Sequence, residues 1–318
     1  MTLIHKIRKT WLYILFFALN FLLVSASAQT SSAVTMSKGN HLYQQAQQSE
    51  KDKQYEKALE YIEQAEILTP NNSEIYLLHA NIFSKLINSA SIFSIRGYFV
   101  GMRENLEKVL QLTPNHIKAK HLLVDLYMML PGFLGGDKER AQILADQLHK
   151  QDPIEGNIAN ANIHRQEESY SAAIHLLQTS IALAPQRLKI QIDLAELLSK
   201  VGENIEAMSL YLSLSGYIQN MESMDDNASQ QLSIVLWEIS ALALQEKNYF
   251  IEAESAMTTY IKLHTSDDKK LGRGYMRLAD IYLSQDKSDF AKTLLNNAKT
   301  IINSKKTIDK INNKLKSI

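Results

Sequence analysis

The sequence predicts an all-α protein, an α-solenoid of about seven stacked helix–turn–helix repeats. Helical periodicity is nearly continuous from residue 39 onward, and few of the 11 Gly and five Pro residues interrupt it. The alternation of β-branched and polar residues that marks strands is missing. The third observation is a spacing of large and small residues that recurs along the chain, as expected for a repeat protein.

The N-terminus has the pattern of a secretory signal peptide. Three basic residues and no acid lie within residues 1–10, residues 11–24 are apolar apart from Asn20, and small residues follow at Ala26 and Ala28. The apolar stretch is shorter than the roughly 17–25 residues that a membrane-spanning helix needs. The pattern predicts cleavage after Ala28 and an exported, periplasmic chain with no membrane span after cleavage; the alternative is an uncleaved anchor.

Composition excludes several classes of function. The chain has 34 Lys+Arg against 34 Asp+Glu, which argues against a nucleic-acid binder. Loss of residues 1–28 removes three basic residues and leaves 31 against 34, a mildly acidic mature chain. The absence of Cys excludes disulfides and thiolate metal sites, so the fold of an exported chain must rest on packing.

The best-formed helical hairpins share one spacing. A large residue is followed by a small one four positions later and by a bulky one three positions after that. Nine residues further on, an Ala begins the pattern of the second helix. Small residues are expected where two helices approach closely, and Pro ends the second helix. The first repeat matches at Leu42, Ala46, Ala58, Ile62, Ala65 and Pro70.

This spacing resembles the tetratricopeptide repeat family, whose period of 34 residues contains two helices. Later repeats match at Ala161, Tyr170, Ala173, Leu177 and Pro185; at Leu194, Ala195, Leu198, Gly202, Ala207 and Tyr211; at Trp237, Ala241, Leu244, Ala253 and Tyr260; and at Tyr275, Leu278, Ala279, Tyr282, Ala291, Leu295 and Ala298. The predicted organisation is a signal peptide (1–28), a short mature segment (29–38), repeats 1–5 (39–220), a linker loop (221–231), repeats 6–7 (232–305) and a C-terminal capping helix (306–318).

Two insertions, near residues 87–99 and 130–136, separate the helices of repeats 2 and 3. The first is apolar for a loop, and the second carries Phe133 and Leu134 among glycines, before Asp137, which is suited to cap the next helix. One interpretation is that both are longer helix ends that pack together. The other is an apolar edge patch, including Phe93, that meets a partner.

No catalytic or cofactor-binding pattern is present. The histidines do not form a zinc-binding helical motif, and neither a nucleophile elbow nor a phosphate-binding glycine loop occurs. We therefore expect no enzyme activity, no cofactor and no metal.

The resemblance implies a groove that is lined by the first helix of each repeat and binds extended peptides or helices. The residues that spacing places there include Asn81, His121, Asp125, Asn162, Arg165 and Glu196. The predicted function is a non-enzymatic exported scaffold that binds a protein or peptide through this groove, the apolar edge, or both. The alternative is a small-molecule-binding accessory of an envelope transport system.

The signal peptide gives the first testable prediction. The chain recovered from outside the cytoplasm is expected to begin at residue 29, and Ala26→Arg with Ala28→Arg should leave it uncut, because the processing site requires small residues. N-terminal sequencing and intact mass report both results. An intact N-terminus on the exported wild-type chain would favour the anchor instead.

Overall fold

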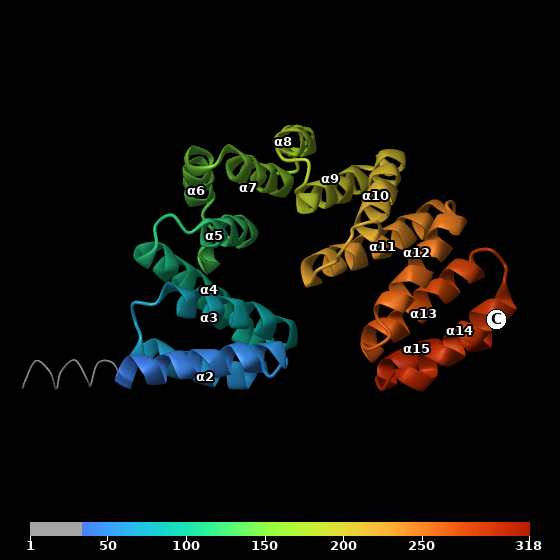
Figure 1. The fold of residues 1–318 in the computed structure, drawn as a ribbon, viewed down its shortest axis with the longest axis horizontal. Coiled ribbons are helices and arrows are strands. Elements are labelled where there is room, and N and C mark those ends of the chain that lie inside the picture. Colours follow the sequence, from blue (N-terminus) through green and yellow to red (C-terminus); the bar gives the residue numbers. More distant parts are fainter. Residues whose placement is uncertain (1–33) are drawn as a thin grey trace, which may run out of the picture. The chain divides into compact units, whose positions relative to one another are not determined.

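Helices are the regular elements of residues 34–318, the part of the chain that the computed structural model describes. The predicted signal peptide lies outside the described residues. The first described helix covers residues 34–51. It is followed by α2 (Tyr55–Leu68), α3 (Ser73–Leu86), η1 (Ile87–Ser89), α4 (Ile92–Leu112), α5 (Ile117–Met129), η2 (Gly132–Leu134), α6 (Lys138–Gln151), α7 (Pro153–Gln166), α8 (Tyr170–Leu183), α9 (Leu188–Val201), α10 (Asn204–Gln219), α11 (Asp226–Glu246), α12 (Phe250–Leu263), α13 (Asp268–Leu283), α14 (Ser288–Ile301) and α15 (Lys305–Ser317) (Figure 1).

Local side chains set several helix starts. The side chains of Asn72, Asp137, Asp225 and Asp267 each accept a hydrogen bond from a backbone N–H two or three residues further on, which caps α3, α6, α11 and α13. The capping role predicted for Asp137 is confirmed: its Oδ1 lies 3.0 Å from the amide nitrogen of Arg140.

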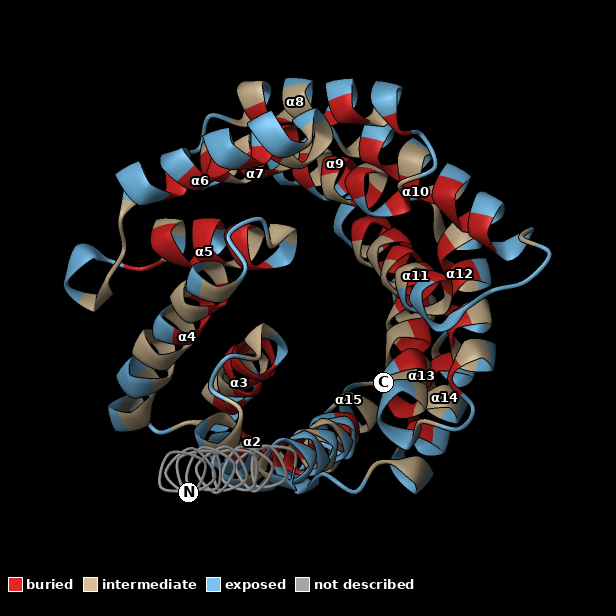
Figure 2. Ribbon diagram, turned by 60° about the vertical axis from the view of Figure 1, so that its left-hand side comes forward, coloured by how far each residue is buried: buried red, intermediate tan, exposed pale blue. Residues whose placement is uncertain are grey.

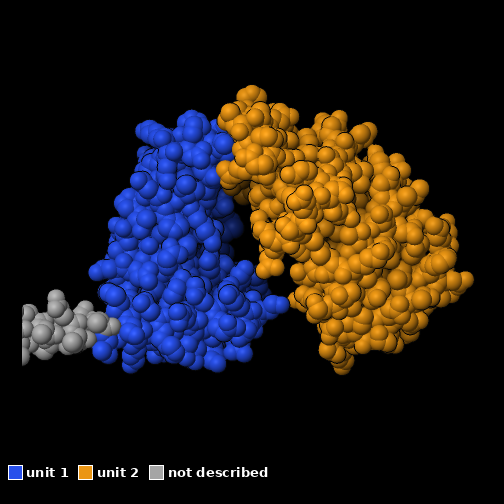
Figure 3. Space-filling model, viewed as in Figure 1, with its two compact units in different colours: residues 1–159 blue, residues 160–318 orange. Residues whose placement is uncertain are grey.

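The chain divides into two compact units, residues 1–159 and 160–318 (Figure 3). In unit 1, α3 packs on α4 and α5 packs on α6; in unit 2, α9 packs on α10, α11 on α12 and α13 on α14. The division lies within α7, not at the predicted linker over 221–231. That linker is also shorter than expected, because residues 226–231 form the first turns of α11 and leave 220–225 between α10 and α11.

Each hairpin closes on small residues, as the spacing predicts. Ala46, Ala58, Ala195, Ala207 and Ala279 are all buried, with larger aliphatic side chains packed around them. Figure 2 shows that buried residues, in red, gather on the facing sides of paired helices. Close approach of two helices needs a small side chain at the crossing, and the fold is therefore an all-α array of helical hairpins of the tetratricopeptide type.

The sixth repeat is shifted by one residue from its predicted register. Ser240 is completely buried at the position predicted for Ala241, which is half-buried. The turn between α11 and α12 explains the shift, because Lys247 and Tyr249 both adopt positive φ angles, 51° and 57°. Trp237, which was matched to the large residue four positions before Ala241, is half-buried, and Leu236 is the buried residue four positions before Ser240.

Most of the first insertion is α-helical. Residues 92–99 form the first two turns of α4, and η2 of the second insertion contacts the same helix. Phe93 and Phe133 are 92% and 80% exposed, while Leu134 is half-buried. The two phenylalanines are therefore not buried in a shared core between the insertions.

None of the described helices is both long and apolar enough to cross a lipid bilayer.

Two glycines test the packing. A Cβ on Gly156 in α7 would lie 2.3 Å from the Cα of His149 in α6, whereas one on exposed Gly216 in α10 would meet no heavy atom within 4 Å. Gly156→Ala should lower the free energy of unfolding by about 1–3 kcal/mol, since backbone must move. Gly216→Ala should raise it by about 0.5–1 kcal/mol through helix propensity. Denaturant titration measures both, and equal effects would contradict the packing.

Candidate functional site

One face of unit 2 is built from the first helices of successive hairpins. The helices α9, α11 and α13 lie on one side, and α10, α12 and α14 lie on the other (Figure 2). Five charged or aromatic side chains of these helices define what we call the first-helix face: Glu196, Trp237, Glu238, Arg273 and Arg277. None of the five is fully buried, so each presents surface to solvent.

Two carboxylates on this face have no partner. Glu196 of α9 and Glu238 of α11 form neither a hydrogen bond nor an ion pair with any described residue. Partial burial by the surrounding helices raises the pKa of both side chains above the ordinary 4.5. The carboxylates of Asp193 and Glu238 raise the pKa of Glu196 further, whereas the ammonium group of Lys189 lowers it. The guanidinium group of Arg277 lowers the pKa of Glu238. Glu196 is exposed, so water screens part of its interaction with these charges.

Two guanidinium groups of α13 lie on the Trp237 ring instead of on these carboxylates. The guanidinium carbon of Arg277 is 4.1 Å from the ring centroid and that of Arg273 is 4.7 Å from it, a cation–π arrangement. Burial lowers the pKa of Arg277, although nearby Asp280 and Glu238 oppose this effect. Neither arginine forms an ion pair with a described carboxylate within 4.0 Å.

Trp237 also contacts a second aromatic ring, which in turn contacts a histidine. Its ring centroid is 5.7 Å from that of Tyr260, which in turn lies edge-on to His264 at 4.5 Å. The Nε2 atom of His264 is 2.8 Å from the hydroxyl oxygen of Ser233. Both residues are buried, and burial lowers the pKa of His264, so this serine–histidine pair braces the tryptophan and offers no open nucleophile.

Ion pairs border the face on both sides. Lys189 pairs with Asp193 within α9, and Lys314 of α15 pairs with Asp280 of α13. Their charges are largely neutralised locally. Of the charged side chains that define the first-helix face, none takes part in these ion pairs.

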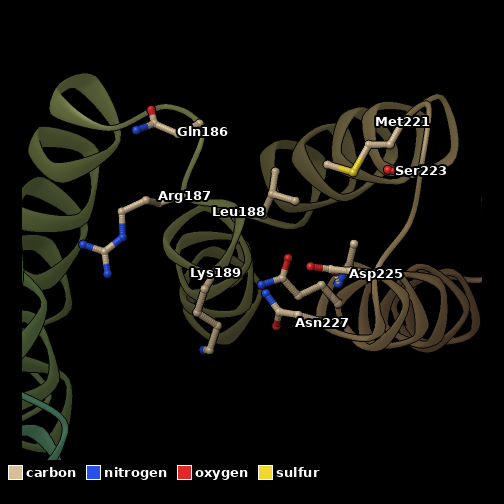
Figure 4. Close-up of a pocket in the computed structure, with 10 residues that line it drawn as sticks. Gln186, Arg187, Leu188, Lys189, Met221, Ser223, Asp225 and Asn227 are labelled. Atoms are coloured by element: carbon tan, nitrogen blue, oxygen red, sulfur yellow. Dashed lines mark hydrogen bonds between the residues drawn. The ribbon is translucent and has the colours of Figure 1, made fainter.

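A cavity of about 450 Å³ opens beside this face, between the starts of α9 and α11. Its lining includes Arg187, Lys189, Asp225, Asn227 and Gln231. Figure 4 shows Asp225 and Asn227 of the α11 start opposite the first turn of α9. Lys189 is paired with Asp193, and the Asp225 carboxylate accepts a hydrogen bond that caps α11. These two charged groups of the cavity therefore already have partners within the protein.

The predicted groove residues separate into the two units. Arg165 of α7 and Glu196 of α9 are close enough in unit 2 for the guanidinium to lower the pKa of the carboxyl. Asn162 also lies on α7 and is half-buried. The structure therefore brings Arg165 and Glu196 together.

The remaining predicted groove residues lie on α3 and α5 of unit 1. His121 Nε2 is 2.7 Å from Glu155 Oε2, so that its ring is already partnered within the unit. Asn81 is half-buried and Asp125 is exposed. The predicted edge residues Phe93, Phe133 and Leu134 also belong to unit 1, on α4 and η2.

Sequence reasoning missed four of the five face residues. Asp193, Glu238 and Arg277 each lie two residues before the buried small residue of their helix, which is Ala195, Ser240 or Ala279. The sequence shows this shared position only when Ser240, and not Ala241, is taken as the small residue of the sixth repeat. The residues described contain no group of three or more side chains that could hold a metal ion.

Comparison with known proteins finds solved structures that this chain resembles at low sequence identity. No family model matches the chain, and no curated protein matches it. A tetratricopeptide repeat protein from Parabacteroides merdae is 15% identical, with 88% of this chain and 98% of that chain covered and a TM-score of 0.48. PilW, a type IV pilus biogenesis factor, is 17% identical over 74% of this chain and 97% of that chain, with a TM-score of 0.44.

The C-terminal part of a tetratricopeptide repeat-containing protein from Cytophaga hutchinsonii gives 14% identity, coverages of 84% and 98%, and a TM-score of 0.46. Because these identities and TM-scores are low, the fold class of this chain is assigned from the packing of its own helices. The paired helices that close on buried small residues are a tetratricopeptide-type fold.

The two unpaired carboxylates predict a pH effect on stability. Their folded-state pKa values are raised, so the folded chain binds protons more tightly than the unfolded chain and loses stability as the pH rises above about 4.5. Glu196→Gln with Glu238→Gln should raise the thermal midpoint at pH 7 by about 1–3 °C, with the gain fading below about pH 4.

Glu222→Gln, in the exposed segment between α10 and α11, is the matched control and should leave the midpoint unchanged. Scanning calorimetry across pH measures the difference. A lower midpoint for the double variant at pH 7 would show that the carboxylates stabilise the fold and have partners there.

Proposed function

We propose that the chain is a non-enzymatic scaffold that binds a segment of another protein on the first-helix face of unit 2. The observation that supports it is the set of unpaired, partly desolvated charges around Trp237. Such charges cost stability in the free protein, and a complementary partner would compensate them. Tryptophan and arginine are also the side chains that contribute most often to binding energy at protein interfaces.

The proposal includes export. The signal-peptide pattern of residues 1–28 supports a periplasmic scaffold, and the mildly acidic mature chain gives no reason to expect a nucleic-acid partner. The apolar edge with Phe93 and Phe133 is a second surface on which a protein could dock, and it lies in the other unit.

Affinity purification of the full-length chain from the cells that export it tests the proposal. Glu196→Lys should reduce recovery of the bound partner about tenfold or more, because a reversed charge repels what the acid attracts. Glu206→Lys is the matched control: it makes the same change at an exposed position on α10, and should recover the partner normally.

A third variant distinguishes the two surfaces. If Phe93→Ser with Phe133→Ser abolishes recovery while Glu196→Lys does not, the partner binds the apolar edge and the proposed face is wrong. Recovery of no partner by the wild-type chain would contradict the scaffold function itself.

A further inference from the structure

The first-helix face of unit 2 separates its unpaired charges by sign. Its two acids without partners, Glu196 and Glu238, lie on α9 and α11, whereas its two guanidiniums without carboxylate partners, Arg273 and Arg277, lie on α13. Of the cations that act on these acids, Lys189 pairs with Asp193 and Arg277 lies over Trp237. Arg165 of α7 lowers the pKa of Glu196 but forms no ion pair with it. An acidic area and a basic area therefore lie side by side on one face.

The distance between neighbouring helices sets the distance between the acidic area and the basic area. Packed helices lie about 8–10 Å apart, and α11 contacts both α9 and α13. A peptide in the polyproline II conformation advances about 3.1 Å per residue with three residues per turn, so residues three apart lie about 9 Å apart on the same side. A peptide that crosses these helices thus presents every third side chain to a neighbouring helix.

We infer that this face takes an extended segment of a partner protein that carries a Lys or Arg over Glu196 and Glu238 and an Asp or Glu three residues away over Arg273 and Arg277. The inference rests on the proposed function and specifies its partner. Each ligand charge would meet two protein charges of opposite sign, and the apolar part of the segment would lie on Trp237. Charge-assisted pairs of this kind are stronger than neutral hydrogen bonds, especially with arginine.

The raised pKa values of the two acids support the same assignment. A carboxylate that burial disfavours gains most from a cation that binds next to it. A uniformly acidic or uniformly basic ligand would satisfy one area and be repelled by the other. This excludes a polyanion such as nucleic acid as the preferred ligand of the face.

Tryptophan fluorescence of the full-length Trp11→Phe chain gives a direct measurement, because Trp237 is then the one tryptophan left of the two in the sequence. The probes are the synthetic peptides APAKPAEPA and APAEPAKPA, which present the two possible chain directions. Their controls are APAQPAQPA, which has no charge, and APAKEPAPA, which has both charges but adjacent. One of the two spaced peptides should bind at least about tenfold more tightly than either control, a difference of about 1.4 kcal/mol.

Charge exchange tests the placement. Glu196→Lys with Glu238→Lys should abolish binding of the preferred peptide and create binding of APAEPAEPA, whereas Glu206→Lys should change neither. Restored binding by the exchanged pair would exclude misfolding as the cause of the loss.

The outcomes separate this inference from the proposed function. Equal binding of charged and uncharged peptides at Trp237 would overturn the charge pattern and leave a peptide-binding face in place. No response to any peptide up to about millimolar concentration would overturn the inference, while the recovery experiment with Glu196→Lys would still decide whether the face binds a protein.

Discussion

The close approach of paired helices at small buried residues is the constraint on which the rest of the structure depends. The chain has no cysteine, so no disulfide crosslinks it, and the described residues contain no metal cluster that could do so. Alanines and one serine at the crossings, such as Ala195, Ser240 and Ala279, let the helices pack tightly. Because this packing fixes the register of each helix, it also decides which side chains point away from the partner helix. The charges of the first-helix face are placed by that register.

The same packing explains how unpaired charges persist on a folded surface. Glu238 and Arg277 occupy equivalent positions on neighbouring helices, but the guanidinium lies over Trp237, which Tyr260 and His264 brace from behind. The carboxylate is left without an ion pair among the described residues and is partly desolvated. A fold selected only for stability would pair or expose these groups. For the proposed binding function, a rigid hairpin that holds these groups in place would lower the cost of ordering them when a partner binds.

The sequence was sufficient for the helical architecture but not for the whole candidate site. The spacing of small residues predicted the hairpins, and the cap at Asp137 followed from its side chain. Trp237 was misplaced because two residues of positive φ in the following turn, Lys247 and Tyr249, shift the sixth repeat by one position, and non-glycine residues rarely signal that conformation. Residues 92–99 were expected to form a loop or a helix end, and α4 shows that they are helical. Whether two charges on different helices pair depends on side-chain packing, which spacing along one chain does not specify.

The titration of Glu196 and Glu238 by carbon-detected NMR tests the central claim most directly, since it observes the unpaired carboxylates themselves. In the free protein both pKa values should lie above 4.5, and saturation with the preferred peptide should lower both, because a bound cation favours the charged form. Ordinary pKa values in the free protein, or raised values that the bound peptide leaves unchanged, would contradict the account. Either result would mean that Glu196 and Glu238 are not unpaired carboxylates that bind a positive charge of the partner.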